Sequence, residues 1–476
     1  MNSEEFRQNA HQFVDWMADY LKDVETYPVK SQVRPKEIYN RIGDHFPVKG
    51  ESIESIFEDF AKDLLPGITH WQSPNFYAYF NANSSPPSVL AEMLTATLGV
   101  QGMKWDTSPA STELEQRTME WLRDAMAIPQ GWIGVIQDTA SSATLAAIIS
   151  AREKMTNFDT NQNGVYAYSK LRIYCSEETH SSIEKGVKIA ELGKENIIKI
   201  KSDHLLQMDA SELEKCIEED KKNGHLPCCI ISTVGTTGTT AIDPIERISA
   251  ISERHNVWHH IDAAYLGSAL LLPEYQHLIK GIEKADSFVF NPHKWMFTNF
   301  DCSVYFVKDK EALIQTFSIL PEYLKTRNDN DVDNHCDWGI PLGRRFRSLK
   351  LWFVMRYYGL EEIQSKLRSH ISMAEWLEEQ VKASSDFHMI IPRTMNLVCF
   401  HFNPELSKNI DEVNKLNEDL LDQINSIGNI YLTHTKVEGK YTLRMVIGQT
   451  NVTMEHIREA WRHIQDVSNE LISRNN

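Results

Sequence analysis

The sequence predicts an α/β protein with a mostly parallel central sheet and a small C-terminal α/β domain. From about residue 88 to 310, short strand-like runs alternate with helical windows, and such βαβ alternation is typical of a parallel sheet covered by helices on both faces. After about residue 365 a second, shorter group of strands and helices follows. The chain has 476 residues, 42% hydrophobic and 24% charged, which fits a globular protein of about three domains.

The first 85 residues are predicted to form a helical arm. Apolar residues recur at helical spacing over 3–25 and again over 52–65, which indicates two amphipathic helices. Pro28 and Pro35 lie between them, and proline breaks helices. The stretch from Trp71 to Pro87 is aromatic and rich in Pro and Asn, so we expect an extended connector there.

Residues 86–365 are predicted to form one large domain. Its expected helices include 141–154 and 243–255, and its expected strands are 135–137, 172–175, 228–232, 257–261, 287–290 and 303–307. Because ligands of such sheets bind at the carboxyl ends of the strands, the residues that follow each strand are the candidates for a site.

Residues 366–476 are predicted to form the small C-terminal domain. Its expected strands are 397–402, 430–435 and 441–447, and its expected helices are 411–426 and 454–473.

Charge and cysteine usage exclude several classes of protein. Lys plus Arg is 49 and Asp plus Glu is 66, so the net charge is −17; such a surface argues against nucleic-acid partners and against anionic membranes. No apolar run approaches the roughly 18 residues of a membrane span, and no signal peptide is visible at Met1. The seven cysteines lack CxxC spacing, as expected for reduced thiols in a cytoplasmic protein.

A loop of small hydroxyl residues follows the first predicted strand. Thr139, Ala140 and Ser141 stand where this strand meets a helix, and helix N-termini bind anions. The loop lacks the lysine of a P-loop and the GxGxxG of a dinucleotide site, so it favours a lone phosphate. A plain helix cap is the alternative.

Further polar residues follow the other strands. His180 comes after 172–175, Thr237 lies in a Gly-rich turn after 228–232, Asp262 follows 257–261, and Lys294 follows 287–290. A lysine between apolar runs has its pKa lowered by desolvation and becomes a nucleophilic amine. An anion loop, a flat ring, a carboxylate and an amine at the ends of one sheet together indicate pyridoxal 5'-phosphate.

A metal site is an alternative that rests on His255, His259 and Asp262. Ligation by two histidines four residues apart needs a helix, and this run is predicted as a strand, so we expect no metal.

Eight segments carry a family resemblance: THWQSPNFYAYF (69–80), SPASTELE (108–115), TASSATL (139–145), THSSIEK (179–185), DAAYLGS (262–268), NPHKW (291–295), NFDCS (299–303) and PLGRRFRSLKLWFV (341–354). With them the chain resembles the group II pyridoxal-phosphate-dependent decarboxylases, and most closely the aromatic L-amino-acid decarboxylases. The resemblance implies the PLP-dependent transferase fold type I (aspartate aminotransferase-like) and a homodimer. It also implies that the N-terminal arm wraps the partner and that residues 101–105 reach the partner's site.

The resemblance also implies roles for individual residues. Lys294 would form the Schiff base, Asp262 would pair with the pyridinium nitrogen, and His180 and Ala264 would lie on opposite faces of the ring. The remaining cofactor contacts would be Thr139, Ala140, Ser141, Thr237, Asn291 and His293. The substrate contacts would be Trp71, Tyr79, Phe80, Asn81, Gln101, Met103, His293 and Gly343.

A polar loop over 321–338 has the composition of a lid. By the resemblance, Tyr323 on this loop would protonate the substrate Cα. Tyrosine at 323 and histidine at 180 both favour simple decarboxylation over oxidative relatives, and Gly343 leaves room for a catechol or indole ring. Gln101, Met103, Asn81 and Cys336 depart from the pattern of animal members.

The leading hypothesis is decarboxylation of an aromatic L-amino acid: tryptophan, 5-hydroxytryptophan, dopa, tyrosine or phenylalanine. An aromatic aldehyde synthase with the same cofactor is the first alternative. A catalytically silent scaffold on the same fold is the alternative from another class.

Overall fold

The computed structural model describes residues 1–168, 170–319, 332–406 and 409–475. The chain divides into two compact units. The central unit comprises residues 82–369, and the terminal unit comprises residues 1–81 together with 370–476. Residues 1–81 therefore belong to the same compact unit as the C-terminal residues, while the division into arm, large domain and small domain stays a prediction.

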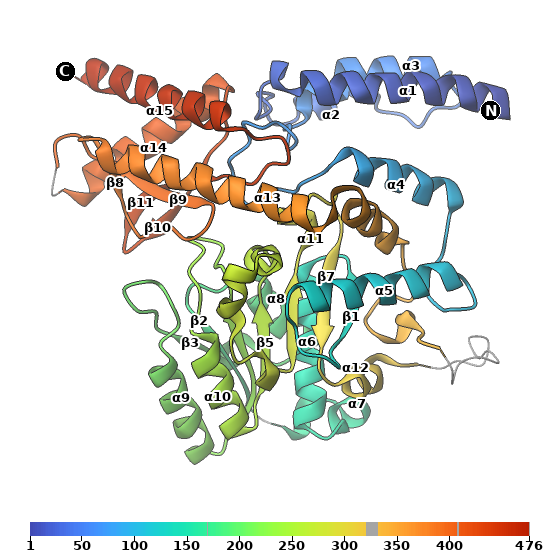
Figure 1. Ribbon diagram of the computed structural model, residues 1–476, viewed down its shortest axis with the longest axis vertical. Coiled ribbons are helices and arrows are strands. Elements are labelled where there is room, and N and C mark those ends of the chain that lie inside the picture. The colour runs from blue at the N-terminus through green and yellow to red at the C-terminus, as the bar shows by residue number, and fades with distance from the viewer. Residues whose placement is uncertain (169, 320–331, 407–408, 476) are drawn as a thin grey trace. The chain divides into compact units, whose positions relative to one another are not determined.

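The central unit is built on one seven-stranded sheet (Figure 1). Its order is β1-β7-β6-β5-β4-β2-β3. The bonded pairs among β2, β3, β4, β5 and β6 are parallel, and β7 is antiparallel to both β6 and β1. The strands are β1 (Ile133–Gln137), β2 (Leu171–Ser176), β3 (Ile197–Ile200), β4 (Leu226–Thr233), β5 (Trp258–Asp262), β6 (Ser287–Phe290) and β7 (Ser303–Val307). The predicted α/β class with a mostly parallel sheet is confirmed.

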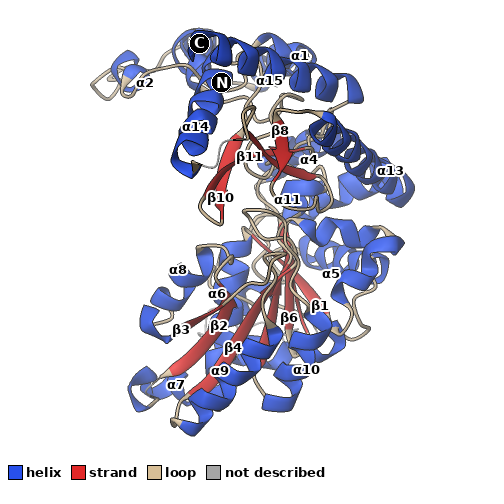
Figure 2. Ribbon diagram, turned by 90° about the vertical axis from the view of Figure 1, so that its left-hand side faces the viewer, coloured by secondary structure: helices blue, strands red, loops and turns tan. Residues whose placement is uncertain are grey.

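Both faces of this sheet are buried under helices (Figure 2). Successive side chains of a strand point to opposite faces. Accordingly, Ile173 and Cys175 of β2 pack in one core cluster with α6 and α8, while Tyr174 between them packs in the other with α9 and α10. Ala143 and Ala147, one turn apart on α6, let this helix lie close to the strands.

The helices of the central unit are α4 (Pro86–Leu98), α5 (Pro109–Ala125), α6 (Ala140–Met155), α7 (Asp159–Asn163), α8 (Ser182–Ile189), α9 (Ala210–Lys222), α10 (Ile245–His255), α11 (Pro292–Trp295) and α12 (Lys310–Phe317). The helical run α13 (Arg347–Ala383) continues into the terminal unit, and Gly359 interrupts it with φ +67°. Short 3-10 turns lie at 165–167, 194–196, 266–271, 273–279, 282–284 and 335–337.

The terminal unit contains a four-stranded antiparallel sheet in the order β10-β11-β9-β8. The strands are β8 (Phe387–Met389), β9 (Leu397–Phe402), β10 (Thr433–Val437) and β11 (Lys440–Val446). One core cluster joins this sheet to α14 (Ile410–Ile427) and α15 (Met454–Asn475), with Phe400 and Trp461 among its members.

The first residues of the terminal unit form α1 (Ser3–Asp23), α2 (Glu37–Arg41) and α3 (Ile53–Asp59). A short 3-10 turn at 24–26 follows α1, and a π-turn at 60–64 and a 3-10 turn at 65–67 follow α3. Asn2 and Glu5 form a capping box that starts α1. Aromatic rings join α1 to α3, with the Phe13 and Phe57 centroids 4.9 Å apart. No α1 residue is buried within the described part of the chain, and Phe6 is 57% exposed.

Two details of the predicted elements are wrong. The expected strand over 430–435 begins only at Thr433, because Leu432 N–H donates to the Asn425 side chain (3.0 Å) instead of a strand. The expected strand over 257–261 is β5, which ends at Asp262 and therefore contains the carboxylate predicted to follow it. The short strands β3 and β8 have no counterpart in the sequence analysis.

Candidate functional site

The predicted cofactor residues lie at one edge of the central sheet. Strands β1, β2, β4, β5 and β6 run in the same direction, so their carboxyl ends share an edge. The segments that follow these strands there carry Thr139, His180, Thr237, Asp262 and Lys294.

Lys294 lies in α11, a single turn that begins two residues after β6. Its side chain is half-buried. Burial lowers the pKa of the Lys294 amine, while the nearby Asp262 carboxylate acts in the opposite direction. A lysine whose pKa is lowered offers more neutral amine at neutral pH, which is the nucleophilic form.

Asp262 is the last residue of β5 and is 5% exposed. Its Oδ1 accepts the Ala264 N–H at 3.0 Å, and its backbone oxygen accepts the Val234 N–H at 2.9 Å. The carboxylate opposes the lowering of the pKa of both Lys294 and His180, so it lies within electrostatic reach of both predicted partners. A buried carboxylate at a strand end is suited to hold a cationic group of a ligand.

His180 follows β2 and remains exposed. Its Nδ1 accepts the Ser182 N–H at 3.1 Å and lies 2.8 Å from the Ser182 hydroxyl, which places the ring proton on Nε2. Partial desolvation lowers the pKa of His180, Asp262 raises it, and Lys294 lowers it further. The ring is therefore a flat, neutral surface beside the amine and the carboxylate.

The predicted phosphate loop is the start of α6. Thr139 is its N-cap, and the Thr139 hydroxyl accepts the Ser142 N–H at 3.4 Å. Ala140 and Ser141 begin the helix, where backbone N–H groups have no intrahelical acceptor. Both interpretations of the loop hold together, since Thr139 is a cap and the first turn of this helix still presents N–H groups suited to an anion.

Asn291 and His293 flank the start of α11, and both are buried. The Asn291 Oδ1 accepts the Ser303 hydroxyl at 2.6 Å, so its amide NH₂ is the group left for a ligand. The His293 Nδ1 accepts the Cys302 N–H at 2.9 Å. Burial, assisted by Lys294, lowers the pKa of His293 to about 3. His293 is therefore a neutral imidazole with its proton on Nε2.

Two further cofactor candidates follow strands β5 and β4. Ala264 is half-buried, and its carbonyl accepts the Asn291 N–H at 3.1 Å, which ties the end of β5 to the start of α11. Thr237 is exposed in the turn after β4, which Gly235 enters with φ +93°.

The predicted substrate residues fall into two groups, one in each unit. In the terminal unit, the Trp71 ring stacks 5.7 Å from Tyr79, and the Tyr79 hydroxyl lies 3.1 Å from that of Tyr431. Phe80 is covered by the Arg444 guanidinium, 5.5 Å from the ring centroid. Asn81 is buried and donates to the Phe76 carbonyl at 3.0 Å. Tyr431 and Arg444 were missed by the sequence analysis.

In the central unit, Gln101, Met103 and Gly343 lie together. The Gln101 Oε1 accepts the Arg344 N–H at 2.6 Å, and a Cβ on Gly343 would stand 3.2 Å from the Gln101 Nε2. The Met103 carbonyl accepts the Cys336 N–H at 2.9 Å. A side chain at position 343 therefore has to displace the Gln101 amide.

Sequence reasoning also missed a buried ion pair at the open edge of β1. The Glu115 carboxylate accepts the Ile136 N–H (2.8 Å) and the Arg344 guanidinium (2.7 Å), and Arg344 donates to the Ile136 carbonyl (2.7 Å). Burial opposes ionisation, but Arg344 and His335 overcome it and lower the pKa of Glu115. The pair supplies hydrogen-bond partners to the backbone of edge strand β1, where a neighbouring strand would otherwise supply them. Its signal was present in the segments SPASTELE and PLGRRF.

Tyr323 and most of the predicted lid lie outside the described residues, which resume at residue 332. The end of the lid segment is described, with Cys336 half-buried and His335 buried.

The metal alternative based on His255, His259 and Asp262 is not brought together. The His259 ring nitrogens lie 2.7 Å from the Ser232 hydroxyl and 3.1 Å from that of Ser249. Within the described residues, the His, Cys, Asp and Glu side chains close enough to share an ion are Glu214, Glu218 and His255. Basic side chains of the protein already contact these residues: Arg254 pairs with Glu214, and Lys221 Nζ lies 3.2 Å from the His255 Nδ1.

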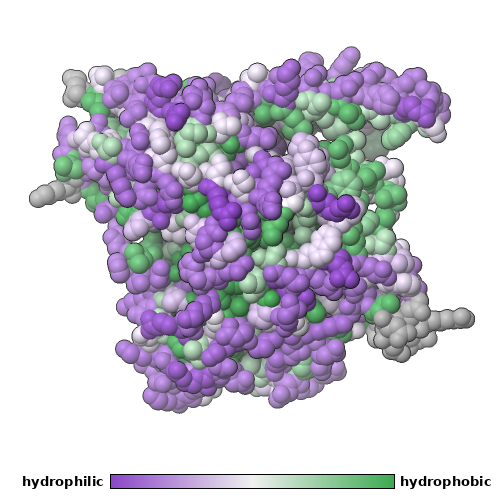
Figure 3. Space-filling view, viewed as in Figure 1, coloured by the Kyte–Doolittle hydropathy of each residue, from purple (hydrophilic) through white to green (hydrophobic). Residues whose placement is uncertain are grey.

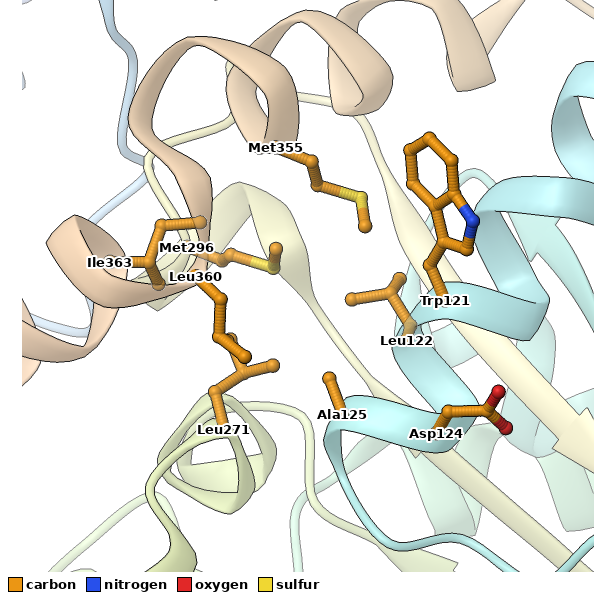
Figure 4. A pocket seen from close by; sticks show the side chains of 9 residues that line it. All are labelled: Trp121, Leu122, Asp124, Ala125, Leu271, Met296, Met355, Leu360 and Ile363. Atoms are coloured by element: carbon orange, nitrogen blue, oxygen red, sulfur yellow. The ribbon is translucent and has the colours of Figure 1, made fainter.

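An apolar pocket of about 340 Å³ lies elsewhere in the central unit, between α5, α13 and the turn after Lys294 (Figure 4). Trp121, Met296, Met355 and Leu360 point into it, and the Asp124 carboxylate points away from it. With no polar group aimed inward among these lining residues, the pocket is not suited to the chemistry at the strand ends.

Within the part of the chain that is described, none of the helices combines the length and the apolar character that crossing a bilayer requires. The seven cysteines are free thiols.

The arrangement at the sheet edge fits pyridoxal phosphate. The first turn of α6 suits its phosphate, the lowered pKa of Lys294 suits bonding to its carbonyl, and Asp262 suits its ring nitrogen. The exposed, neutral His180 suits the ring face. Fold and site thus define an enzyme of the class that attaches a carbonyl cofactor to a lysine.

Comparison with known proteins gives the same class. Residues 35–403 match the pyridoxal-dependent decarboxylase conserved domain. Tyrosine decarboxylase 2 of Narcissus pseudonarcissus is 43% identical over 99% of this chain and 96% of its own. Phenylacetaldehyde synthase of Arabidopsis thaliana is 40% identical over 99% of this chain and 97% of its own. The chain belongs to the pyridoxal-dependent decarboxylase family.

A solved structure agrees over the whole length. The crystal structure of Catharanthus roseus tryptophan decarboxylase in complex with L-tryptophan superposes with a TM-score of 0.93, at 40% identity and 99% coverage of both chains. The protein is therefore a pyridoxal-phosphate-dependent carboxy-lyase of fold type I, as the resemblance implied.

Proposed function

We propose that the protein decarboxylates aromatic L-amino acids to the arylalkylamine and CO₂. The observation that carries the proposal is the meeting of Lys294, Asp262 and His180 at the strand ends, where the Asp262 carboxylate acts on both the Lys294 amine and the His180 imidazole. Relatives that act on tyrosine and tryptophan support the aromatic class of substrate.

Each residue of the edge has a part in this chemistry. Bound pyridoxal phosphate supplies a carbonyl that bonds to amines and a ring that withdraws electrons from the bond to be broken. Lys294 offers its neutral amine to that carbonyl. Asp262 holds a proton at the ring nitrogen, which keeps the ring electron-deficient. The buried, neutral His293 offers its Nε2–H to the substrate carboxylate.

Cα must then receive a proton, and we assign this step to Tyr323. The assignment rests on the resemblance, since residue 323 lies outside the described part of the chain. A general acid must reach Cα before the cofactor carbon is protonated, so Tyr323→Phe is expected to raise the share of aldehyde product. Unchanged product ratios would remove Tyr323 as the donor.

The oxidative alternative has a specific support. A relative of 40% identity is a phenylacetaldehyde synthase, so overall similarity does not separate decarboxylation from aldehyde synthesis. The tyrosine at position 323 and the histidine at position 180 favour the decarboxylase.

We further propose that Gly343, Gln101 and Met103 set the ring preference. Glycine at 343 lets the Gln101 amide keep its place, because a Cβ would stand 3.2 Å from its Nε2; by the resemblance, glycine at this position goes with catechol or indole rings. By the resemblance, Trp71, Tyr79, Phe80 and Asn81 would also contact the substrate.

A homodimer in the cytoplasm is part of the proposal. Leu90, Leu94 and Leu98 on α4 are 55%, 47% and 61% exposed, and Figure 3 shows apolar surface over this helix. Exposed apolar area of this kind is typical of a protein interface, and α1 likewise lacks a buried face. A second copy would cover both, with residues 1–85 as the wrapping arm, 86–365 as the cofactor domain and 366–476 as the small domain. Seven free thiols fit a reducing compartment.

A panel of seven separate incubations tests the function. The holoenzyme is given tryptophan, 5-hydroxytryptophan, dopa, tyrosine, phenylalanine, histidine and glutamate separately, and CO₂, amine and hydrogen peroxide are quantified. Amine equal to CO₂ with an aromatic substrate is the expected result. Peroxide equal to CO₂ would establish the aldehyde synthase, and no product with any substrate would establish the silent scaffold. Lys294→Ala is the control that should lose both activity and the visible absorbance of the bound cofactor.

A further inference from the structure

The turn that carries Lys294 has little secondary structure of its own. Helix α11 spans only Pro292–Trp295, and Phe297 shortly after it has φ +54°. Backbone hydrogen bonds of this turn run from Lys294 N to the Asn291 carbonyl (2.9 Å) and from Met296 N to the Pro292 carbonyl (3.1 Å). A helix of a single turn is marginal by itself, so contacts with other segments help to hold its conformation.

That support comes from residues 83–88, more than 200 positions earlier in the chain. The Asn83 side-chain amide donates to the Lys294 carbonyl at 2.6 Å, and the Asn83 N–H donates to the His293 carbonyl at 2.9 Å. The Ser85 hydroxyl donates to the Phe297 carbonyl at 2.7 Å. The Asn299 N–H donates to the Ser88 hydroxyl at 2.7 Å.

The Ser85 side chain serves the lysine turn and does not cap its own helix. Ser85 is the N-cap of α4, yet its hydroxyl makes no cap bond. Pro86 and Pro87 occupy the first two helical positions and have no N–H to offer a cap. Asn83, Ser85 and Ser88 are 1%, 3% and 0% exposed, so their bonds are shielded from water, and breaking one removes a hydrogen-bond partner from a polar group of the lysine turn or of the residues after it.

We propose that Asn83 is a positioning residue for Lys294, and that residues 83–88 hold the lysine backbone so that the amine stays in its desolvated place beside Asp262. The proposal rests on Lys294 as the lysine that bonds to the cofactor. Loss of the Asn83 amide would let the turn relax and the amine hydrate. The pKa of Lys294 would then return toward its ordinary range, because desolvation is what lowers it.

The test replaces Asn83 by leucine, which keeps the volume and the neutral charge but removes the donor. Apoprotein is mixed with pyridoxal phosphate between pH 6 and 10, the bond is fixed with borohydride, and labelling of the Lys294 peptide is followed by mass spectrometry. Asn83→Leu is expected to slow attachment at neutral pH about tenfold, the equivalent of one buried hydrogen bond, and to move the pH midpoint upward. Ser85→Ala should also slow attachment and raise its pH midpoint, but by a smaller amount than Asn83→Leu.

Asn417→Leu is the matched control in the terminal unit. The Asn417 amide is also buried, and it donates to the Phe402 and Val413 carbonyls at 2.8 Å each. It should lower the thermal unfolding midpoint and leave attachment to Lys294 unchanged. If Asn83→Leu behaves like Asn417→Leu, Asn83 is merely structural and the proposal is wrong. If Asn83→Leu does not fold, Ser85→Ala decides on the same readouts. Absence of labelling at Lys294 in the unmodified protein would instead overturn the cofactor assignment.

Discussion

Buried polar side chains in the middle of strand β5 differ from the one at its end in how fully they are hydrogen-bonded. In the middle, the His259 ring lies 2.7 and 3.1 Å from two serine hydroxyls, and the His260 ring lies 2.9 and 3.4 Å from the hydroxyls of Ser287 and Thr144. At the end, the Asp262 side chain accepts the Ala264 N–H and lies within electrostatic reach of Lys294 and His180. A buried side chain whose hydrogen bonds are all made within the protein is typical of a structural group. A buried side chain at a strand end that can still accept hydrogen bonds is typical of a ligand-binding group.

The largest test of this contrast removes the charge at Asp262. Asp262→Asn should leave the fold intact but lower the decarboxylation rate on the order of 10²–10³-fold, the range for loss of one preorganised electrostatic group. The matched control is Asp286→Asn at the amino end of β6, where the carboxylate accepts the His259 N–H at 2.8 Å. Asp286→Asn should cost stability and spare the turnover of the folded enzyme, measured with saturating cofactor. If Asp262→Asn and Asp286→Asn lose turnover equally, the carboxyl ends of the strands are not functionally distinct from the amino ends.

The histidines of β5 supply the next test, through pH. Burial lowers the pKa of His259 and of His260 to about 3, while the unfolded chain binds a proton near pH 6.5. The unfolded state therefore gains protons first as pH falls, so stability is full above about pH 6.5 and declines toward pH 3. Between pH 6.5 and 5 each histidine should remove about 2 kcal/mol of unfolding free energy, at 1.36 kcal/mol per pH unit.

His259→Gln isolates this contribution. Glutamine does not titrate, so the variant should start less stable at pH 7.5 and lose less stability on acidification than the unmodified protein. Urea unfolding at a series of pH values measures both curves. Parallel curves would mean that His259 does not stay neutral in the fold.

The parts of the fold and site that the sequence predicts are those whose residues are neighbours in the chain. Polar residues directly after apolar runs, such as Asp262 and Lys294, were predictable because strand and strand-end residue are neighbours in the chain. The bond from Asn83 to Lys294 spans 211 positions and the pair of Glu115 and Arg344 spans 229, and no local pattern encodes such distances. Strand β3 was missed because it has four residues, three of them outside the core.

The smallest expected effect distinguishes two helix caps. Asp209 caps α9 with bonds of 2.8 and 3.2 Å to the Ser211 and Glu212 N–H groups, whereas Thr139 caps α6 with one long bond of 3.4 Å. Asp209→Ala should therefore cost about 1–2 kcal/mol and Thr139→Ala about 0.5 kcal/mol of unfolding free energy. If the start of α6 is the phosphate site, Thr139→Ala should also weaken pyridoxal phosphate binding, and Asp209→Ala should not. Calorimetric titration of the apoprotein with the cofactor, set beside urea unfolding, separates the two quantities. A Thr139 variant that loses stability alone would make its hydroxyl a cap and nothing more.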